Sequence, residues 1–364
     1  MTGQQKAPKT FKMAAVPATL SNHDFMAIGS TITKYTNTME CGLEEQAIGI
    51  NVPDDDTENN KNPSIKLLET TPSVKIMSSD RLPLIYFQDG IQRTQFVGNV
   101  FSDKIKRLVP ILFTTVGAVI VKLDGEHILR HLDPIIIEKF ITPDPDLLPK
   151  EIANAIPKEY LKVVSGFTAS MHPNTFRERV LMDEVRALRH ETERSIVRQF
   201  EKTNPDDWLV LDGPISNFDP GDKRVGIVKR HYLSWIDPDV MFIALKDFVV
   251  NNGQRIRSCK FQITYKSRGS MEAIACYTKL LYNFKAGMAT NPEFSLIRVE
   301  TPFKHAASFD GILNTILDMN TPMSNPSDQW DKKIYPILMA EKFLKATAKD
   351  DTLIRTAFGG LDFA

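Results

Sequence analysis

The sequence predicts a mixed α/β domain that contains both parallel and antiparallel strand pairs. Three observations lead to this class. Apolar, strand-like segments dominate residues 82–128, an amphipathic helix pattern covers residues 174–202, and strand and helix patterns alternate from residue 208 onward. Consecutive strands pair readily as antiparallel neighbours, whereas strands separated by a helix can pair in parallel, so the chain needs both kinds of pairing.

The first 80 residues differ in character from the rest. Residues 24–50 could form a helix and a strand, and residues 51–64 are acidic, polar and turn-rich, which is typical of a loop. We therefore divide the chain into an irregular N-terminal extension, residues 1–80, packed on one main domain, residues 81–364.

Consecutive strands open the main domain. The apolar run that begins at Leu82 stops at Asp89-Gly90, a turn signal, and strand-like residues 91–100 follow. Residues 108–128 are rich in Val, Ile, Thr and Phe and contain a second turn signal at Asp124-Gly125. We expect antiparallel strands here, and then short helices and loops over the proline-rich residues 133–172.

The strongest single pattern is the helix at residues 174–202, which Asn204-Pro205 should end. Its other faces are charged, and its apolar positions recur at steps of three and four residues: Val185, Leu188, Thr192 and Ile196. Beyond it, strands are predicted at residues 208–211, 224–231, 258–266 and 294–299, and helices at residues 237–250, 306–319 and 334–347.

Composition limits the class of protein. The hydrophobic fraction of 42% and charged fraction of 25% are typical of a soluble globular protein. Lys+Arg and Asp+Glu both number 45, so a nucleic-acid-binding surface would need its positive charge concentrated on one face or supplied by metal ions.

The cysteines and apolar runs bear on the compartment. Cys41, Cys259 and Cys276 are far apart and have no CxxC spacing, which argues against a disulfide framework and a zinc site. The longest apolar run, residues 108–121, is too short and interrupted to span a bilayer, and the N-terminus does not resemble a signal peptide. We expect a cytoplasmic protein without a membrane partner.

Two acidic residues close apolar strands, and each precedes a glycine. Asp89 ends IYFQDG and Asp212 ends WLVLDG. A carboxylate at a strand end can face a cleft, and the glycine permits a sharp turn and leaves room for a ligand. One such pair is more often a plain turn, but two pairs that flank a glutamate-bearing helix indicate a functional site.

The helix between them carries Glu184, Glu191 and Glu193. Carboxylates from two strands and a helix would make an oxygen-rich site for Mg²⁺ or Mn²⁺, and two such ions can promote phosphodiester hydrolysis. Helical geometry places Glu193 about 80° and Glu191 about 120° from the centre of the apolar stripe. This favours Glu193 slightly and leaves Glu191 open, with Glu184 as a weaker third candidate; for each, a solvated helix face is the alternative.

The order of these motifs resembles the NurA family of nucleases over about residues 82–345. WLVLDGPIS followed by RVGIVKRH, with Asp212 and Lys229, is the closest piece, and IYFQDGIQR resembles the family's first acidic motif, with Asp89 as a metal ligand. IYPILMAEKFLK resembles the family's proline-containing C-terminal helix, except that Glu341 stands where the family has histidine.

The resemblance implies a ribonuclease H-like mixed sheet flanked by helices, in a homodimer. It also implies a DNA nuclease, with exonuclease and single-strand endonuclease activity, that depends on Mn²⁺ or Mg²⁺ and works with HerA, a hexameric DNA-translocating ATPase. Asp89, Asp212 and one of Glu191 or Glu193 would then bind metal. Glu341 could be a fourth ligand, and Lys229 would contact the scissile phosphate as a point charge.

Other interpretations are compatible with the sequence. Glu341 in place of histidine and the zero net charge are compatible with a catalytically inert DNA-binding or ATPase-docking subunit. A kinase-like member of the wider ribonuclease H-like group is disfavoured because phosphate-loop glycines are absent. Five basic residues around one strand could follow a DNA backbone or protect a sheet edge: Arg255, Arg257, Lys260, Lys266 and Arg268.

Overall fold

The computed structural model describes eight stretches of the chain: residues 19–36, 63–77, 80–229, 236–251, 253–266, 271–281, 293–319 and 330–358. Several features named above lie outside the described residues, namely Cys41, Arg268, residues 37–50, most of the polar segment 51–64 and the end of the strand predicted at 224–231.

The described strands form one 13-stranded sheet in the order β1-β11-β12-β13-β9-β8-β3-β4-β6-β7, with β10 paired to β12 and β2, and β5 paired to β4. The pairs β3–β8, β8–β9 and β6–β7 are parallel, and the other pairs are antiparallel. The predicted α/β class with a mixed sheet is therefore confirmed. The strands are β1 (Ser64–Leu67), β2 (Ser73–Lys75), β3 (Tyr86–Ser102), β4 (Arg107–Asp124), β5 (His127–Arg130), β6 (Ile135–Thr142), β7 (Leu161–Val163), β8 (Leu209–Asp212), β9 (Arg224–Val228), β10 (Ile256–Ser258), β11 (Phe261–Tyr265), β12 (Met271–Lys279) and β13 (Leu296–Pro302).

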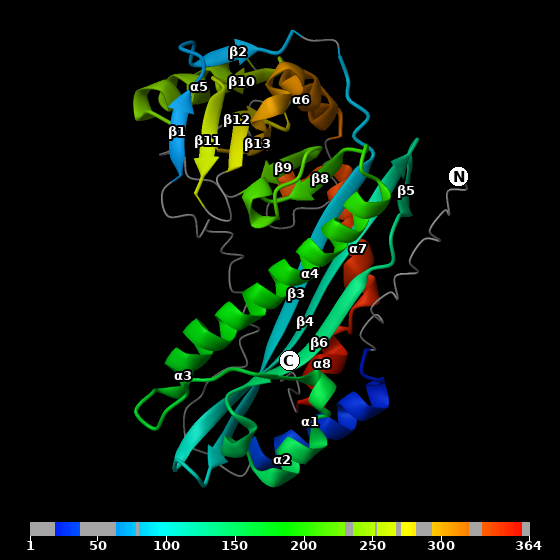
Figure 1. The fold of residues 1–364 in the computed structure, drawn as a ribbon, viewed down its shortest axis with the longest axis vertical. Coiled ribbons are helices and arrows are strands. Elements are labelled where there is room, and N and C mark those ends of the chain that lie inside the picture. The colour runs from blue at the N-terminus through cyan, green and yellow to red at the C-terminus, as the bar shows by residue number, and fades with distance from the viewer. Residues whose placement is uncertain are drawn as a thin grey trace, which may run out of the picture.

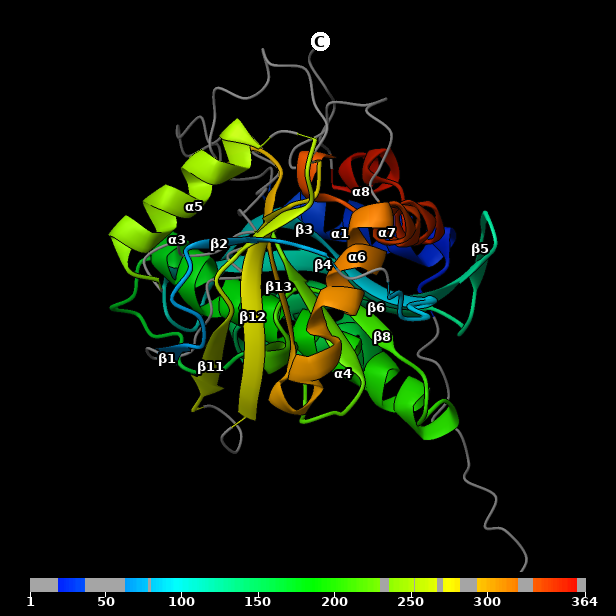
Figure 2. The ribbon, with the colours of Figure 1, turned by 90° about the horizontal axis from the view of Figure 1, so that it is seen from above.

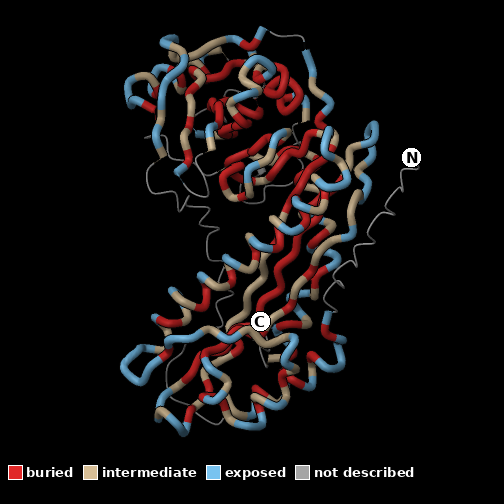
Figure 3. The backbone as a smooth tube through the Cα atoms, in the orientation of Figure 1, coloured by how far each residue is buried: buried red, intermediate tan, exposed pale blue. Residues whose placement is uncertain are grey.

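Helices cover both faces of this sheet. The long helix α4 runs along β3 and β4 on one face, and α7 lies on the other (Figures 1 and 2). β4, β8, β9 and β13 are buried along most of their length, whereas β3 is continuously buried only at its start (Figure 3). The helices are α1 (Asn22–Thr36), α2 (Lys150–Ala155), α3 (Pro173–Thr175), α4 (Met182–Thr203), α5 (Pro238–Val250), α6 (Phe309–Asp318), α7 (Tyr335–Thr347) and α8 (Asp351–Ala357).

The longest hairpin joins β3 and β4, and it corrects one prediction. The pairing is antiparallel from Tyr86 opposite Lys122 to Ser102 opposite Arg107, with one bulge near Gly98. The turn predicted at Asp89-Gly90 is wrong, because both residues lie inside β3 and pair with β4. A partner strand that continues past a DG pair supplies its backbone hydrogen bonds and keeps it extended.

The second DG signal behaves as predicted. Asp124 pairs with His127, so a two-residue loop reverses the chain between β4 and β5. Gly125 has φ +61°, a left-handed conformation that glycine adopts without a steric cost.

The helix predicted at residues 174–202 is also confirmed. Helical backbone is continuous through α3, a π-helical turn (Phe176–Leu181) and α4. It ends at Asn204, whose N–H donates to the Phe200 carbonyl at 2.8 Å. Three of the four predicted apolar-stripe residues are buried: Val185, Thr192 and Ile196.

Other elements were predicted less completely. Residues 133–172 contain the expected short helix α2, but also β6, a strand that the prolines around it obscured. The strand predicted at 258–266 is β11, and the separate strand β10, which overlaps that range only at Ser258, was not predicted, nor was α8. The predicted strands β8, β9 and β13 and helices α5, α6 and α7 are present.

The described parts of residues 1–80 pack on the main domain. The ring of Phe25 on α1 lies 4.7 Å from that of Phe113 on β4 and 5.3 Å from that of Phe358. β1 pairs with β11 and β2 with β10. The division at residue 80 stays a prediction.

Two expectations from composition concern thiols and membranes. Cys259 and Cys276 are buried free thiols, and burial raises the pKa of each. In the part of the chain that is described, no helix is long and apolar enough to cross a membrane.

Candidate acidic site

Asp89 lies on β3, near the middle of the sheet, and is only 4% exposed. On one side β3 pairs with β4 throughout. On the other side its pairing with β8 ends at Gln88, because β8 itself ends at Asp212. The strand therefore holds Asp89 rigidly at the point where β8 stops.

Strand alternation places three charged side chains on one face. Residues two positions away from them pack in the core under α7: Phe87, Ile91, Val210 and Ile227. Because side chains alternate between faces along a strand, Asp89, Asp212 and Lys229 point to this same face. Ala340 of α7 packs in that core as well, and Glu341 follows it.

Three carboxylates lie on this face, those of Asp89, Asp212 and Glu341, and lysines bind the last two. Nζ of Lys229 lies 2.6 Å from Oδ1 and 2.7 Å from Oδ2 of Asp212. Glu341 accepts from Lys333 through Oε2 and from Lys345 through Oε1, both at 2.6 Å. The hydrogen bond described for the Asp89 carboxylate comes from the Gly90 N–H at 2.8 Å.

The pKa directions show that these charges interact. Burial, and then the negative charge of Asp212, raise the pKa of Asp89 well above its usual range; Lys229 opposes this and Glu341 adds to it. Burial acts to lower the pKa of Lys229, but Asp212 and Asp89 raise it overall. The four groups therefore form one electrostatic cluster.

Glu193 approaches Asp89 from the other face. A Cβ atom built on Gly90 would lie 2.1 Å from Oε1 of Glu193, so the carboxylate occupies the space that the glycine leaves. The Glu193 side chain is 12% exposed and lies within 3.7 Å of Arg189 Nε and 3.5 Å of His190 Nδ1. Glu193 is thus beside Asp89 along β3, across the sheet from Glu341.

The other two helix glutamates are not brought to this cluster. Glu191 is exposed and pairs with Arg194 and Arg198 on the outer face of α4. Glu184 pairs with Lys162 at 2.8 Å. The helical geometry that favoured Glu193 therefore agrees with where the structure places these side chains.

A buried ion pair fixes the turn after Asp212, and the sequence analysis missed it. Oε1 of Glu300 accepts from the Ile215 N–H at 2.7 Å, and Oε2 accepts from Tyr265 Oη at 2.8 Å and Arg298 Nε at 3.2 Å. Arg298 and Glu300 are fully buried. Two charged residues two positions apart in the apolar run LIRVETP were the available signal.

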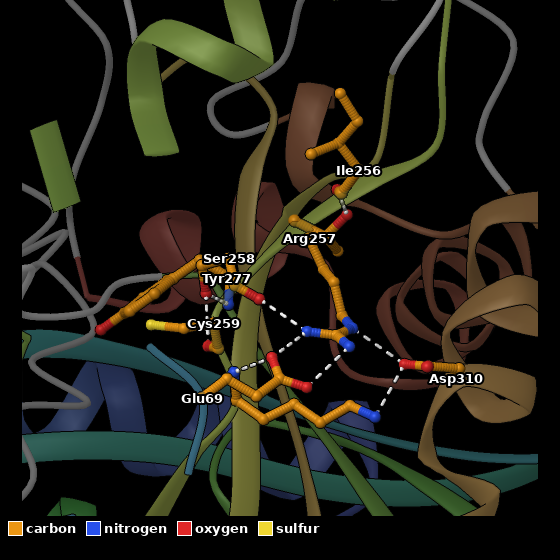
Figure 4. A network of polar contacts seen from close by, with 9 residues as sticks. Glu69, Ile256, Arg257, Ser258, Cys259, Tyr277 and Asp310 are labelled. Carbon is orange, nitrogen blue, oxygen red and sulfur yellow. Dashed lines mark hydrogen bonds and ion pairs between the residues drawn. The ribbon is translucent and has the colours of Figure 1, made fainter. Parts of the chain in front are cut away.

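The basic cluster around β10 and β11 has structural partners. The Arg257 guanidinium binds Glu69 and Asp310, Lys260 binds Asp310, and Arg255 binds Asp318 (Figure 4 shows the contacts of Arg257). Because Arg257 is buried, it cannot follow a DNA backbone in this conformation.

The three carboxylates have the right chemistry for a divalent cation, but they are not arranged as a metal site. Carboxylate oxygens are the ligands that Mg²⁺ and Mn²⁺ prefer, and Asp89, Asp212 and Glu341 supply them. Among the described residues, however, no group of three or more His, Cys, Asp or Glu side chains is arranged to hold a metal ion. Lysines engage two of the carboxylates instead.

No protein-family model matches this chain, and no curated protein matches it either.

Proposed function

We propose that this protein is a metal-dependent DNA nuclease of the NurA type with a ribonuclease H-like core. The observation that carries the proposal is the cluster of Asp89, Asp212 and Glu341 around Lys229, in which Asp89 is buried and the other two carboxylates are partly exposed. Glu193 adds a fourth carboxylate against Gly90, from the opposite face.

The topology supports the ribonuclease H-like part of the proposal. Three antiparallel strands, β6-β4-β3, continue into two parallel strands, β8-β9, and α4 connects the two groups in the chain. Along the chain, Asp89 lies on β3, Glu193 on α4, Asp212 at the end of β8 and Glu341 on α7. This is the order that the sequence motifs predicted.

The chemistry of the cluster suits phosphodiester hydrolysis. Asp89 and Asp212 would hold a divalent cation, with Glu341 as the third carboxylate on the same face, whereas Glu193 lies against Gly90 on the opposite face. When bound, the cation supplies the positive charge that stabilises a phosphodiester transition state. Lys229 orients Asp212 and brings a permanent positive charge to the site. It is the residue that we propose contacts the scissile phosphate.

The remaining parts of the proposal come from the resemblance alone. They are a homodimer, a HerA-like hexameric ATPase as partner, the processing of DNA ends and a cytoplasmic location.

The proposal predicts that Asp212→Asn abolishes cleavage. End-labelled single- and double-stranded DNA would be incubated with Mn²⁺, Mg²⁺ or EDTA. Loss of residues that merely support a metal ligand costs 10–100-fold, so loss of a ligand should lower the cleavage rate more than about 100-fold. Asp219→Asn is the matched control, because Asp219 follows β8 as a half-exposed carboxylate paired with Arg198, and it should keep full activity. A fully active Asp212→Asn protein would contradict the site.

A second candidate, an inert DNA-binding or ATPase-docking subunit, is favoured by one observation. Lysines already neutralise Asp212 and Glu341, so these two carboxylates are balanced without a metal. Calorimetry with Mn²⁺ separates the two functions. A nuclease should bind Mn²⁺ with an affinity that falls in Asp89→Asn, whereas an inert subunit should show no binding that depends on Asp89.

A further inference from the structure

Glu341 is held differently from the other acids of the site. Each of its two oxygens accepts from a different lysine: Lys333, which precedes α7, and Lys345, one turn further along α7. The Lys333 side chain is 13% exposed and that of Lys345 is 53% exposed, so one ammonium is largely covered and the other reaches solvent. With both oxygens engaged, a cation that binds Glu341 competes with two ammonium groups for the same carboxylate.

We propose that Lys333 and Lys345 bind the phosphates of a nucleic-acid strand, and that they release Glu341 to a divalent cation as they do so. This inference rests on the proposed nuclease function and names the groups that would bind its substrate. Lys345 is accessible to a polyanion in the described conformation, and Lys333 lies on the other oxygen of the same carboxylate.

Charge balance explains why the two ligands would bind together. A cation that approached alone would be repelled by the two ammonium groups bound to Glu341. A phosphate that took the lysines alone would leave the Glu341 carboxylate without a counter-charge. When both bind, each lysine exchanges a carboxylate for a phosphate and Glu341 exchanges ammonium groups for a cation, so no charge is left unpaired.

The proposed exchange also explains why lysines, and not a shared metal position, hold the carboxylates in the described residues. Asp212 and Glu341 are lysine-bound, and no three-carboxylate group forms. In the proposed exchange, binding of the strand is the event that frees the Glu341 carboxylate.

Two measurements on the full-length chain test the exchange separately. The first is Mn²⁺ affinity by calorimetry without DNA. Lys333→Gln and Lys345→Gln should each tighten Mn²⁺ binding, and the double variant by about tenfold, within the usual range of coupling between two sites. Lys342→Gln, which removes the same charge from an exposed position on α7, is the control for general electrostatics.

The second measurement is the affinity for a labelled single-stranded oligonucleotide in EDTA, by fluorescence anisotropy. Glu341→Gln should tighten binding because it frees both lysines, and Lys333→Gln and Lys345→Gln should weaken it. Glu191→Gln is the matched control, since Glu191 also holds two cationic side chains, Arg194 and Arg198, on the outer face of α4.

The outcomes show whether the lysine exchange fails alone or together with the proposed nuclease function. Lysine variants that match Lys342→Gln in both measurements would overturn the exchange and leave the nuclease proposal intact. Mn²⁺ binding by none of the proteins would overturn the proposed metal-dependent function and the exchange with it.

Discussion

At the scale of single residues, Gly90 explains how Glu193 can lie against β3 on the face opposite Asp89. Asp89 points to the α7 face of β3 and Glu193 lies against the α4 face, and the absent side chain of Gly90 lets Glu193 approach the strand. The glycine of the first DG motif therefore serves close packing and not a turn. This use of glycine appears only when the two faces of β3 are seen together.

Gly90→Ala should destabilise the protein by about 1–3 kcal/mol, because the new Cβ would lie 2.1 Å from Glu193 Oε1 and force the carboxylate away. Urea unfolding followed by circular dichroism measures this. Glu193→Ala removes the clashing carboxylate, so the double variant should cost less than the sum of the single changes. Additive costs in this double-mutant cycle would show that the two residues do not compete for the same space.

At the scale of elements, a charged network joins pieces that are distant in the chain. The segment between β1 and β2 contributes Glu69, β10 contributes Arg257 and α6 contributes Asp310 (Figure 4). Arg257 donates to Glu69 through Nη1 at 2.5 Å and Nη2 at 2.9 Å, a bidentate geometry, and donates to Asp310 through Nε at 2.9 Å. The network fastens a strand-linking segment of the N-terminal 80 residues to the sheet.

This network should make stability depend on pH. Burial acts to raise the pKa of Glu69, but hydrogen bonds from Arg257 and Lys260 lower it below the usual 4.5. A lowered folded-state pKa gives stability that is fully present above the unfolded-state pKa and is lost as the pH falls through the folded value.

Glu69→Gln should accordingly cost about 1–3 kcal/mol of unfolding free energy at pH 7, because a buried guanidinium loses one of its two charged partners. The difference from wild type should shrink as the pH falls below 4.5. Urea unfolding at a series of pH values measures it, with Glu272→Gln, on the exposed part of β12, as the control. A difference that stays constant down to pH 3 would rule out the ion pair as its source.

At the scale of the whole molecule, β3 contributes residues to three cores, and two of them lie toward opposite ends of the strand. Phe87 and Ile91 pack with α6 and α7, whereas Val97 and Val100 pack with α1 near the far end of the strand (Figure 1). A single strand that crosses both cores, paired with β4 over its whole length, should couple their unfolding.

The two cores should therefore unfold in one transition. Phe113→Ala, in the core around α1, should cost about 3–5 kcal/mol. The probe is Trp208, in the other core, made the sole tryptophan by replacing Trp235 and Trp330 with phenylalanine in both proteins compared. Its fluorescence transition should shift with the far-UV circular dichroism. An unshifted fluorescence transition would mean that the cores unfold independently.

The sequence determined the local elements wherever a pattern had one explanation. The 3.6-residue period of residues 174–202 required a helix with Glu193 nearer its buried side, and WLVLDG required a buried strand that stops at Asp212. The spacing of apolar residues along one element indicates which of its faces is buried, and this information lies within the element itself.

Tertiary structure decided what the same residues contact. It made Asp89-Gly90 part of an extended strand, because β4 continues beside it, and it buried Glu300 to hold the turn after Asp212. It also gave both oxygens of Glu341 to lysines. Hydrogen-bond partners and counter-charges come from segments distant in the chain, and no local pattern records that distance. Ile215 lies 85 residues from Glu300, and Glu69 lies 188 residues from Arg257.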